Sequence, residues 1–474
     1  MTAPVIDTDY LVIGSGAAGL AFADTLIQEN SDAHVTIVDR RGKPGGHWND
    51  AYPFVTLHQP SSFYGVNSLE LGSGRKDTVG ANSGLYELAS GPEVSAYYDR
   101  VMNHRLLPSG RVSYHPLCND LGEGEFESLL SGVRTRVNVR KKVVDATYFS
   151  PSVPATHTPR FKVSEGVRVV PPNALPGLWY SSQGIGFARR FVVIGAGKTA
   201  MDACVWLIQS GTDPEAIRWV VPRDSWVVNR VTTQNAPEFF DEAIGGQAAQ
   251  MQALAEASSA DDLFLRLEAC GVMLRIDPNH TPTMFHFATL APGEVQVLRR
   301  IRDVLRLGRV QALEAGHMVL EHGRVPVEPG ALFIDCTASA VEFRPPLPVF
   351  QGNTIVPQIV RAPLPSFSAA LIAYVEAHYE DEAHKNRLCG SVPFPHSPGD
   401  YPRTMMANML NQFYWAQDKA LREWMRASRL DGFGKLIASA DKQDVAKQAI
   451  IARLKEQAAA AMANLPKLIA SAAG

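Results

Sequence analysis

The chain has 474 residues, of which 46% are hydrophobic and 20% charged, as is typical of a globular protein with room for more than one domain. Its 45 basic and 48 acidic side chains give a formal net charge of −3. Without a basic excess, we expect no nucleic acid among its partners. Because the apolar runs have only strand length and no signal-like segment opens the chain, we also expect no membrane partner and a cytoplasmic location.

The first predicted unit is a strand, a glycine turn, a helix and a second strand. Apolar residues 10–13 lead into Gly14-Ser-Gly-Ala-Ala-Gly19, then helical residues 20–28 and strand residues 34–38. In such a turn the first glycine allows the tight bend, the second admits a diphosphate, and the third allows close helix–strand contact. An acid after the second strand can accept hydrogen bonds from ribose hydroxyls. The cofactor contacts expected here are Gly14, Gly16, Ala18, Gly19, Asp39 and Arg40.

Residues 42–110 are rich in glycine, serine, proline and aromatic residues, which predicts loops wrapped around a ligand. Within them, Gly46, His47 and Trp48 are expected to lie against the same cofactor, with Trp48 as a flat apolar wall. Residues 93–102 are predicted to form a helix, and residues 133–149 and 158–170 short strands. Val144, in the first of these strands, is a further expected cofactor contact.

A second unit of the same kind begins about 180 residues later, with a predicted strand at residues 190–194, a glycine turn and a helix at residues 201–209. After its next strand the chain reads Val221-Pro222-Arg223, so no acid stands at the ribose position. An arginine there can pair with a 2′-phosphate, which favours NADPH over NADH. The expected contacts are Gly195, Gly197, Lys198, Thr199, Ala200 and Arg223. The P-loop-like ending of this turn is excluded because Val192 stands where that motif needs its first glycine.

These patterns predict an α/β fold with two Rossmann-like dinucleotide-binding domains, the first discontinuous and the second inserted into it, and a helical C-terminal part. The expected segments are 1–185 for the first part of the FAD-binding domain, 186–325 for the NADPH-binding domain with a helical insertion, and 326–474 for the return and the helical C-terminus. Residues 237–307 are expected to be largely helical. Asp335, after a short strand, is expected to lie on the return toward the flavin.

The Gly45-Gly46-His47-Trp48 segment, followed by Tyr52-Pro53, resembles the flavin-containing monooxygenase superfamily. The resemblance covers most of the chain in layout and implies FAD in the first unit and NADPH in the second. It further implies that NADPH reduces the flavin, that O2 then forms a C4a-(hydro)peroxyflavin, and that one oxygen atom passes to a small organic substrate. It also suggests Asn67 as a catalytic residue, and we add His58 from the loop expected to face the flavin ring.

Two departures narrow this expectation. Members that oxidise ketones by Baeyer–Villiger chemistry carry a histidine-containing fingerprint before the second glycine turn, but residues 175–187 contain no histidine. The segment Asp335-Cys336-Thr337 matches the Ala-Thr-Gly of the family only in part. We therefore expect a divergent member, for which standard Baeyer–Villiger oxidation is in doubt.

The spacing of the cysteines argues against two kinds of site. Cys118, Cys204, Cys270, Cys336 and Cys389 are scattered, and no two have CxxC or similar spacing, so neither a redox dithiol nor a metal site is expected. An NADPH-dependent flavoprotein reductase or oxidase without substrate oxygenation stays open as the alternative. A catalytically silent nucleotide sensor and a single-component flavin halogenase also stay open. The sequence also leaves a homodimer open and does not identify the substrate.

Overall fold

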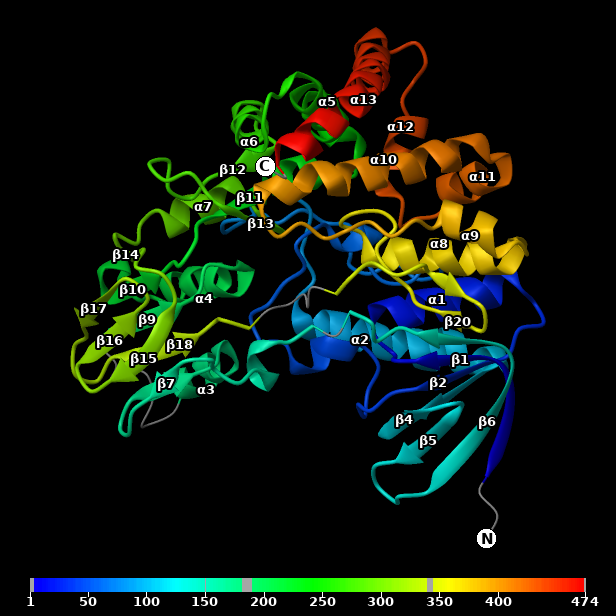
Figure 1. Ribbon diagram of the computed structural model, residues 1–474, viewed down its shortest axis with the longest axis horizontal. Coiled ribbons are helices and arrows are strands. Elements are labelled where there is room, and N and C mark those ends of the chain that lie inside the picture. Colours follow the sequence, from blue (N-terminus) through cyan, green and yellow to red (C-terminus); the bar gives the residue numbers. More distant parts are fainter. Residues whose placement is uncertain (1–3, 150, 181–189, 339–343, 473–474) are drawn as a thin grey trace.

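The computed structural model describes residues 4–149, 151–180, 190–338 and 344–472. Two mixed α/β units lie side by side, the first in blue and cyan and the second mostly in green, while orange and red C-terminal helices extend across both (Figure 1). The expected fold class is confirmed, because each unit has a sheet with parallel strands at its centre and a glycine turn after one of them. The first sheet is completed by strands from the C-terminal third of the chain.

The first sheet has the strand order β19-β20-β6-β1-β2-β3, and the β4–β5 hairpin continues from β6. Parallel strands that are covered on both faces have continuous apolar sequences, as the buried residues 10–12 at the centre of this sheet do. Helices α1 and α8 pack against each other, and α8 comes from the C-terminal return. The bounds are β1 Val5–Ile13, α1 Ala17–Glu29, β2 Val35–Val38, α2 Gly91–Val101, β3 Val112–His115, β4 Cys118–Gly122, β5 Glu125–Ser128, β6 Arg134–Asp145, β19 Phe350–Gln351, β20 Thr354–Ile355 and α8 Pro365–His378.

The second sheet is fully parallel, with the order β14-β10-β9-β18-β8. Helices α4 and α7 contact each other beside it, and the sheet also shares an apolar core with the small β17-β16-β15-β7 sheet. The bounds are β7 Lys162–Val163, β8 Arg168–Val170, α3 Leu175–Tyr180, β9 Phe191–Ile194, α4 Lys198–Gln209, β10 Ile217–Val220, α7 Pro292–Leu298, β14 Asp303–Leu305, β15 Val310–Glu314, β16 His317–Leu320, β17 Gly323–Pro326 and β18 Leu332–Asp335.

The sheet topology corrects the expected boundary at residue 325. Strand β18 was expected in the returning FAD domain, but it pairs with β9 and β8 in the second sheet, and Asp335 therefore ends a strand of the second unit. A short strand buried on both faces carries no alternation that tells which sheet it joins. The other expected boundary, between residues 185 and 186, lies outside the described residues, although β8 already belongs to the second sheet.

The insertion between β10 and β14 is only partly helical, which corrects the expectation for residues 237–307. It contains helices α5 and α6 but also a three-stranded sheet in the order β12-β11-β13. Strand β13 was not predicted because its aromatic, apolar sequence is equally compatible with a buried helix. The bounds are β11 Ser225–Asn229, α5 Gly246–Glu256, α6 Ala260–Ala269, β12 Met273–Leu274 and β13 Met284–Leu290.

The C-terminal helices share a core with this insertion. Phe264 and Phe285 of the insertion pack with Tyr401 of α10 and Leu465 of α13, and the Asn464 side chain donates to the carbonyls of Leu254 and Ala257 at the end of α5 (2.9 and 2.8 Å). None of the helices within the described ranges is long and apolar enough to cross a membrane. The bounds are α9 Glu382–Leu388, α10 Tyr401–Gln417, α11 Lys419–Ala427, α12 Gly432–Ala438 and α13 Val445–Ser471.

Candidate dinucleotide sites and the contact between them

The first glycine turn has the geometry that its sequence predicts. Gly14 has a φ of +97°, and a Cβ atom on Gly19 would lie 2.0 Å from the Gly14 carbonyl oxygen. A Cβ on Gly16 would lie 3.6 Å from the Cα of Gly46, so the predicted Gly-Gly loop passes directly beside the turn. Helix α1, which begins at Ala17, has no side-chain cap and no acidic residue in its first turn. Its first amides, including that of Ala18, are therefore available to an anion.

Asp39 lies at the end of β2, as predicted, and its buried carboxylate is held beside the turn. It accepts hydrogen bonds from the Ser15 amide (2.6 Å), the Ser15 hydroxyl (2.7 Å) and the Arg41 amide (2.7 Å). Three donors fix its orientation, so it connects the glycine turn to the strand end where a ribose would lie. Arg40 is exposed beside it.

The loop after β2 brings His47 and Trp48 to the same region. The Gly45 amide donates to the Ser15 carbonyl (2.8 Å), which fastens the loop to the turn. The Trp48 indole donates to the Tyr64 hydroxyl (2.8 Å), and its ring stacks on that of His47 at 5.4 Å. Desolvation, helped by the charge of Arg41, lowers the pKa of His47 to about 4, so this imidazole is neutral at pH 7.

The second glycine turn repeats the first in its backbone and differs in its side chains. The Gly195 amide donates to the Val220 carbonyl (3.0 Å), as the Gly14 amide donates to that of Val38 (2.8 Å). Gly195 has a φ of +125°, and a Cβ there would lie 2.7 Å from the Cys336 carbonyl oxygen. A Cβ on Gly197 would meet nothing within 4 Å, which leaves open space at the N-terminus of α4.

Helix α4 also begins without a side-chain cap or an acidic residue in its first turn, unlike α2, α6, α11 and α13, which Ser or Asp side chains cap. Thr199 lies in this first turn, and Ala200 is fully buried where the first unit has Gly19. The two helices that begin at glycine turns therefore share unoccupied amides, as an anion site requires.

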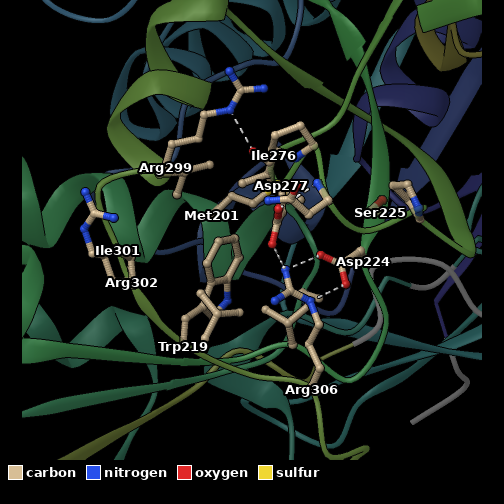
Figure 2. Close-up of a pocket in the computed structure, with 17 residues that line it drawn as sticks. Met201, Trp219, Asp224, Ser225, Ile276, Asp277, Arg299, Ile301, Arg302 and Arg306 are labelled. Carbon is tan, nitrogen blue, oxygen red and sulfur yellow. Dashed lines mark hydrogen bonds and ion pairs between the residues drawn. The ribbon is translucent and has the colours of Figure 1, made fainter.

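A cavity of about 380 Å³ adjoins this second turn (Figure 2). The Trp219 ring forms part of its wall, and the Trp219 indole donates to the Gly195 carbonyl (2.7 Å). In the view of Figure 2, Arg306 lies between Asp224 and Asp277 and pairs with both carboxylates, at 2.8 and 2.9 Å. The other lining residues are Ala196, Met201, Val221, Ser225, Ile276, Pro278, Asn279, Pro282, Leu298, Arg299, Ile301, Arg302 and Val304.

Arg223 lies just beyond β10, as expected, and Val221 occupies the position that Asp39 has in the first unit. One Arg223 nitrogen lies 3.7 Å from the Met284 sulfur. Desolvation, followed by the charge of Arg309, lowers the pKa of Arg223. At the position of Asp39 the second unit therefore has an uncharged residue, and a positively charged side chain follows two residues later.

Lys198 lies at the start of α4, but its ammonium group turns to carboxylates. It contacts the Asp202 carboxylate and lies 3.9 Å from the Glu294 carboxylate. Tyr52, from the loop of the first unit, donates its hydroxyl to the other Asp202 oxygen (2.6 Å). The predicted role of Lys198 as an NADPH contact stays a prediction, since the ammonium belongs to a contact between the two units.

A buried arginine completes this contact between the units. The Arg230 side chain has 0% exposure and pairs with Glu294 at 2.5 Å. It also donates to the carbonyls of His58 (3.1 Å) and Thr289 (3.1 Å) and to the Asn82 side-chain oxygen (3.1 Å). Because His58 and Asn82 belong to the first unit, one buried cation joins the loops of the first unit to the second.

The two predicted catalytic residues lie at the edges of this region. His58 is exposed, and its backbone carbonyl accepts a hydrogen bond from Arg230 (3.1 Å). The Asn67 side-chain oxygen accepts a hydrogen bond from the Ser428 hydroxyl (2.9 Å), in the segment between α11 and α12. The adjoining Arg429 donates to the carbonyls of Ser62, Tyr64 and Val66. The C-terminal part therefore covers the Asn67 loop, and a catalytic role for Asn67 stays a prediction.

Two further expected cofactor contacts have other local partners. Val144 is fully buried in β6, opposite Val12, and belongs to the core of the first unit. The Asp335 carboxylate accepts from the Thr337 amide (3.0 Å) and hydroxyl (2.6 Å), next to the second glycine turn rather than on the path back to the first. Both remain predictions as cofactor contacts.

Sequence reasoning missed the residues that join the units. Tyr52 was noted only as part of the Tyr-Pro resemblance, and Asp202, Arg230 and Glu294 were not singled out. The partners of Arg230 are 59 to 172 positions away along the chain, so no local pattern marks this residue.

Comparison with known proteins gives both a family and a likeness in fold. The chain is 44% identical over 470 residues to the uncharacterized protein Rv2000 of Mycobacterium tuberculosis, and the match covers 99% of this chain and 86% of that protein. The chain belongs to the family of this mycobacterial protein. Residues 12–59 match the family described as NAD(P)-binding Rossmann-like domain.

Among solved structures, an oxidised steroid monooxygenase bound to NADP is 13% identical, with a TM-score of 0.49 over 78% of this chain and 85% of that one. A cyclohexanone-bound cyclohexanone monooxygenase is 14% identical, with a TM-score of 0.47 over 96% of this chain and 98% of that one.

Proposed function

We propose that the chain is an FAD-dependent, NADPH-consuming monooxygenase that inserts one oxygen atom from O2 into a small organic substrate. The observation that carries this proposal is the pair of glycine turns on two units in direct contact. Each turn opens a helix whose first amides have no side-chain cap. One domain that holds a flavin and a second that delivers a nicotinamide suit hydride transfer between two cofactors.

The residues of the first unit fit FAD. Gly16 and Gly46 approach each other closely, so no side chain from either residue stands between the turn and a bound cofactor. Asp39 offers a carboxylate of fixed orientation for the ribose. The residues of the second unit fit NADPH, with open space at Gly197 and positive charge at Arg223. When bound, the flavin supplies the electron transfer and the reaction with O2.

The chain's own residues contribute orientation and a dry environment. Tyr52 and Arg230 hold the loops of the first unit against α4 and β13 of the second through buried hydrogen bonds. Around them, the neutral His47 and the Trp48 ring form a half-buried wall beside the first turn. We propose His58 and Asn67 as the residues nearest the reaction.

The alternative is an NADPH-dependent flavoprotein reductase or oxidase without substrate oxygenation. A reductase with a reactive thiol is disfavoured, because burial raises the pKa of the Cys204 and Cys336 thiols well above the usual value. A direct oxidase differs from a monooxygenase only in the fate of oxygen, so kinetics must separate the two.

The test is a stopped-flow experiment on protein loaded with FAD. The protein is first reduced with NADPH without oxygen, then mixed with oxygenated buffer while the flavin spectrum is followed. A transient near-ultraviolet band before oxidised flavin returns is expected for oxygen transfer. Direct reoxidation with stoichiometric hydrogen peroxide and no such band would support the oxidase. If neither NADPH nor NADH reduced the flavin, the monooxygenase and the reductase or oxidase would both be rejected.

A further inference from the structure

The short segment between helices α11 and α12, residues 428–430, is buried against the first unit. Ser428 is 1% exposed, and the Leu430 side chain lies in the hydrophobic core of that unit. The Ser428 amide donates to the Trp424 carbonyl (2.9 Å) where α11 ends, and the Leu430 amide donates to the Ser428 hydroxyl oxygen (3.2 Å). Backbone on both sides therefore sets the position of the Ser428 hydroxyl.

This hydroxyl determines which end of the Asn67 side chain faces it. Its oxygen accepts from the Leu430 amide, so its single hydrogen needs an acceptor of its own, and Asn67 Oδ1 lies 2.9 Å away. The side-chain nitrogen of Asn67 makes no hydrogen bond to a described residue. With its oxygen engaged by Ser428, the Asn67 amide presents its NH2 group, which can only donate, to a molecule beside the loop.

The loop residues on both sides of this asparagine are held by buried side chains of helices α1 and α2. The Tyr97 hydroxyl of α2 accepts from the Val66 amide (2.8 Å) and donates to the Leu69 carbonyl (2.7 Å). The Asp24 carboxylate of α1 accepts from both the amide (3.0 Å) and the hydroxyl of Ser68. The backbone around the asparagine is thus fixed from the side of the first sheet.

Arg429 holds the same loop from the opposite, C-terminal side. Its partly buried guanidinium donates to the carbonyls of Ser62, Tyr64 (2.6 Å) and Val66. Desolvation lowers the pKa of Arg429, so the charge pays for its burial in lost hydration. The hydrogen bonds to the loop offset this cost only while the three carbonyls keep their positions, which makes the guanidinium a constraint on the loop.

We propose that Ser428 and Arg429 are positioning residues for the proposed reaction. Arg429 fixes the backbone of residues 62–66, and Ser428 orients the Asn67 amide so that its NH2 group donates toward the bound flavin. This inference rests on the proposed function, in which Asn67 lies near the reaction. An Asn67 side chain free to rotate would turn its oxygen to the flavin part of the time, and an acceptor cannot replace a donor at the same place.

The first experiment separates the donor from its orientation in FAD-loaded protein. N67D replaces the NH2 group with oxygen but still accepts from Ser428, whereas S428A keeps the NH2 group and frees its rotation. We expect the limiting rate constant for flavin reduction by NADPH to fall at least tenfold in N67D and about three- to tenfold in S428A. The control S439A removes a hydroxyl that donates to the Leu436 carbonyl (2.9 Å) in α12, and should leave the rate unchanged.

The absorption spectrum of the oxidised flavin gives a readout that does not depend on turnover. A hydrogen bond to the flavin ring changes its electronic properties, so the spectrum should shift in N67D and S428A and stay unchanged in S439A. Equal rates and equal spectra in S428A and S439A would overturn the positioning role and leave the proposed function intact. If NADPH does not reduce the flavin of the unsubstituted protein, the proposed function is rejected, and the role of Ser428 with it.

A double-mutant cycle tests whether Ser428 acts through Asn67. In the N67L background the amide is absent, so adding S428A should not slow flavin reduction further. A further slowing as large as that of S428A alone would show that Ser428 acts independently and would overturn the inference.

The role of Arg429 is tested by amide hydrogen exchange of residues 62–69. We expect exchange at least tenfold faster in R429M, and an intermediate rate in R429K, which keeps the charge and some of the donors. The control R426M removes an exposed arginine of α11 and should leave exchange unchanged. R429K alone decides the question if R429M does not fold, and exchange as slow as in the unsubstituted protein would refute the constraint on the loop.

Discussion

The two glycine turns of this protein share their backbone but not their side chains. In both, the first glycine amide donates to the last carbonyl of the neighbouring strand, Val38 in one unit and Val220 in the other. Where the first unit has Gly19 and Asp39, the second has Ala200 and Val221. In a Rossmann unit the backbone of the glycine turn positions the diphosphate, whereas the residue at the end of the second strand selects the nucleotide.

The third position of the turn shows how much room each unit leaves. A Cβ on Gly19 would lie 2.0 Å from the Gly14 carbonyl oxygen, while the second unit accommodates the Cβ of Ala200 with full burial. Helix and strand therefore approach more closely in the first unit. The two turns therefore differ in the side-chain size that their third position accommodates, and the unfolding free energies of variants measure this difference.

The largest effect should come from breaking the contact that holds the two units together. Arg230→Met leaves the Glu294 carboxylate buried without its partner, which should destabilise the protein by about 3–5 kcal/mol. Chemical unfolding at pH 7 measures this. Arg218→Met is the control, because Arg218 pairs with Asp303 at the surface and its loss should cost less than about 1 kcal/mol. Equal losses in both variants would contradict a special role for the buried pair.

The next largest effect should come from changing the side-chain size at the third position of each turn. Gly19→Ala should destabilise the first unit by about 1–3 kcal/mol, because the new Cβ meets backbone that cannot rotate away. It should also lower the FAD content of the purified protein, measured by absorbance after denaturation. Ala200→Gly, the opposite change in the second unit, should cost only about 0.5–1 kcal/mol. If Gly19→Ala retains full FAD and stability, the close approach has no energetic consequence.

A smaller effect should follow from giving the second unit the acid of the first. Val221→Asp places a carboxylate at the strand end, where it can accept from a ribose and repel a 2′-phosphate. We expect the ratio of NADPH to NADH affinity to fall about tenfold, equivalent to about 1.4 kcal/mol. Equilibrium binding of both nucleotides measures it, with Val221→Asn as the uncharged control. A parallel loss of both nucleotides would indicate damage to the fold.

The smallest effect concerns acid stability. The pKa of Glu294 is lowered: burial opposes this, but the charges of Lys198 and Arg230 outweigh it. A lowered pKa means that its stabilisation is present above the unfolded value of about 4.5 and is lost as pH falls through the folded value. The difference in unfolding free energy between the protein and its Glu294→Gln variant should therefore shrink below pH 4.5. A difference that stays constant from pH 7 to pH 3.5 would exclude this account.

The glycine turns, the Asp39 position and the discontinuous first domain could be predicted because their signals are local. A turn that needs a φ of +97° at Gly14 needs glycine in the sequence, and buried parallel strands need apolar runs. Strand β18 was assigned to the wrong sheet, since pairing partners of a short buried strand are not written in the strand itself.

The parts of the site that could not be predicted depend on tertiary contacts. Lys198 was expected to face a nucleotide, but the approach of Asp202 and Glu294 gave its ammonium another partner. Asn67 is covered by Ser428, from a segment 361 positions away. A long side chain takes whichever partner the assembled fold brings near it.

The C-terminal helices have a consequence for how the whole chain unfolds. Through Asn464 they are bonded to the insertion of the second unit, and through Ser428 and Arg429 they are bonded to the Asn67 loop of the first. Neither unit can lose its fold without exposing apolar surface on this shared part. Heating should therefore give one cooperative transition with equal calorimetric and van't Hoff enthalpies, rather than two domain transitions at separate temperatures.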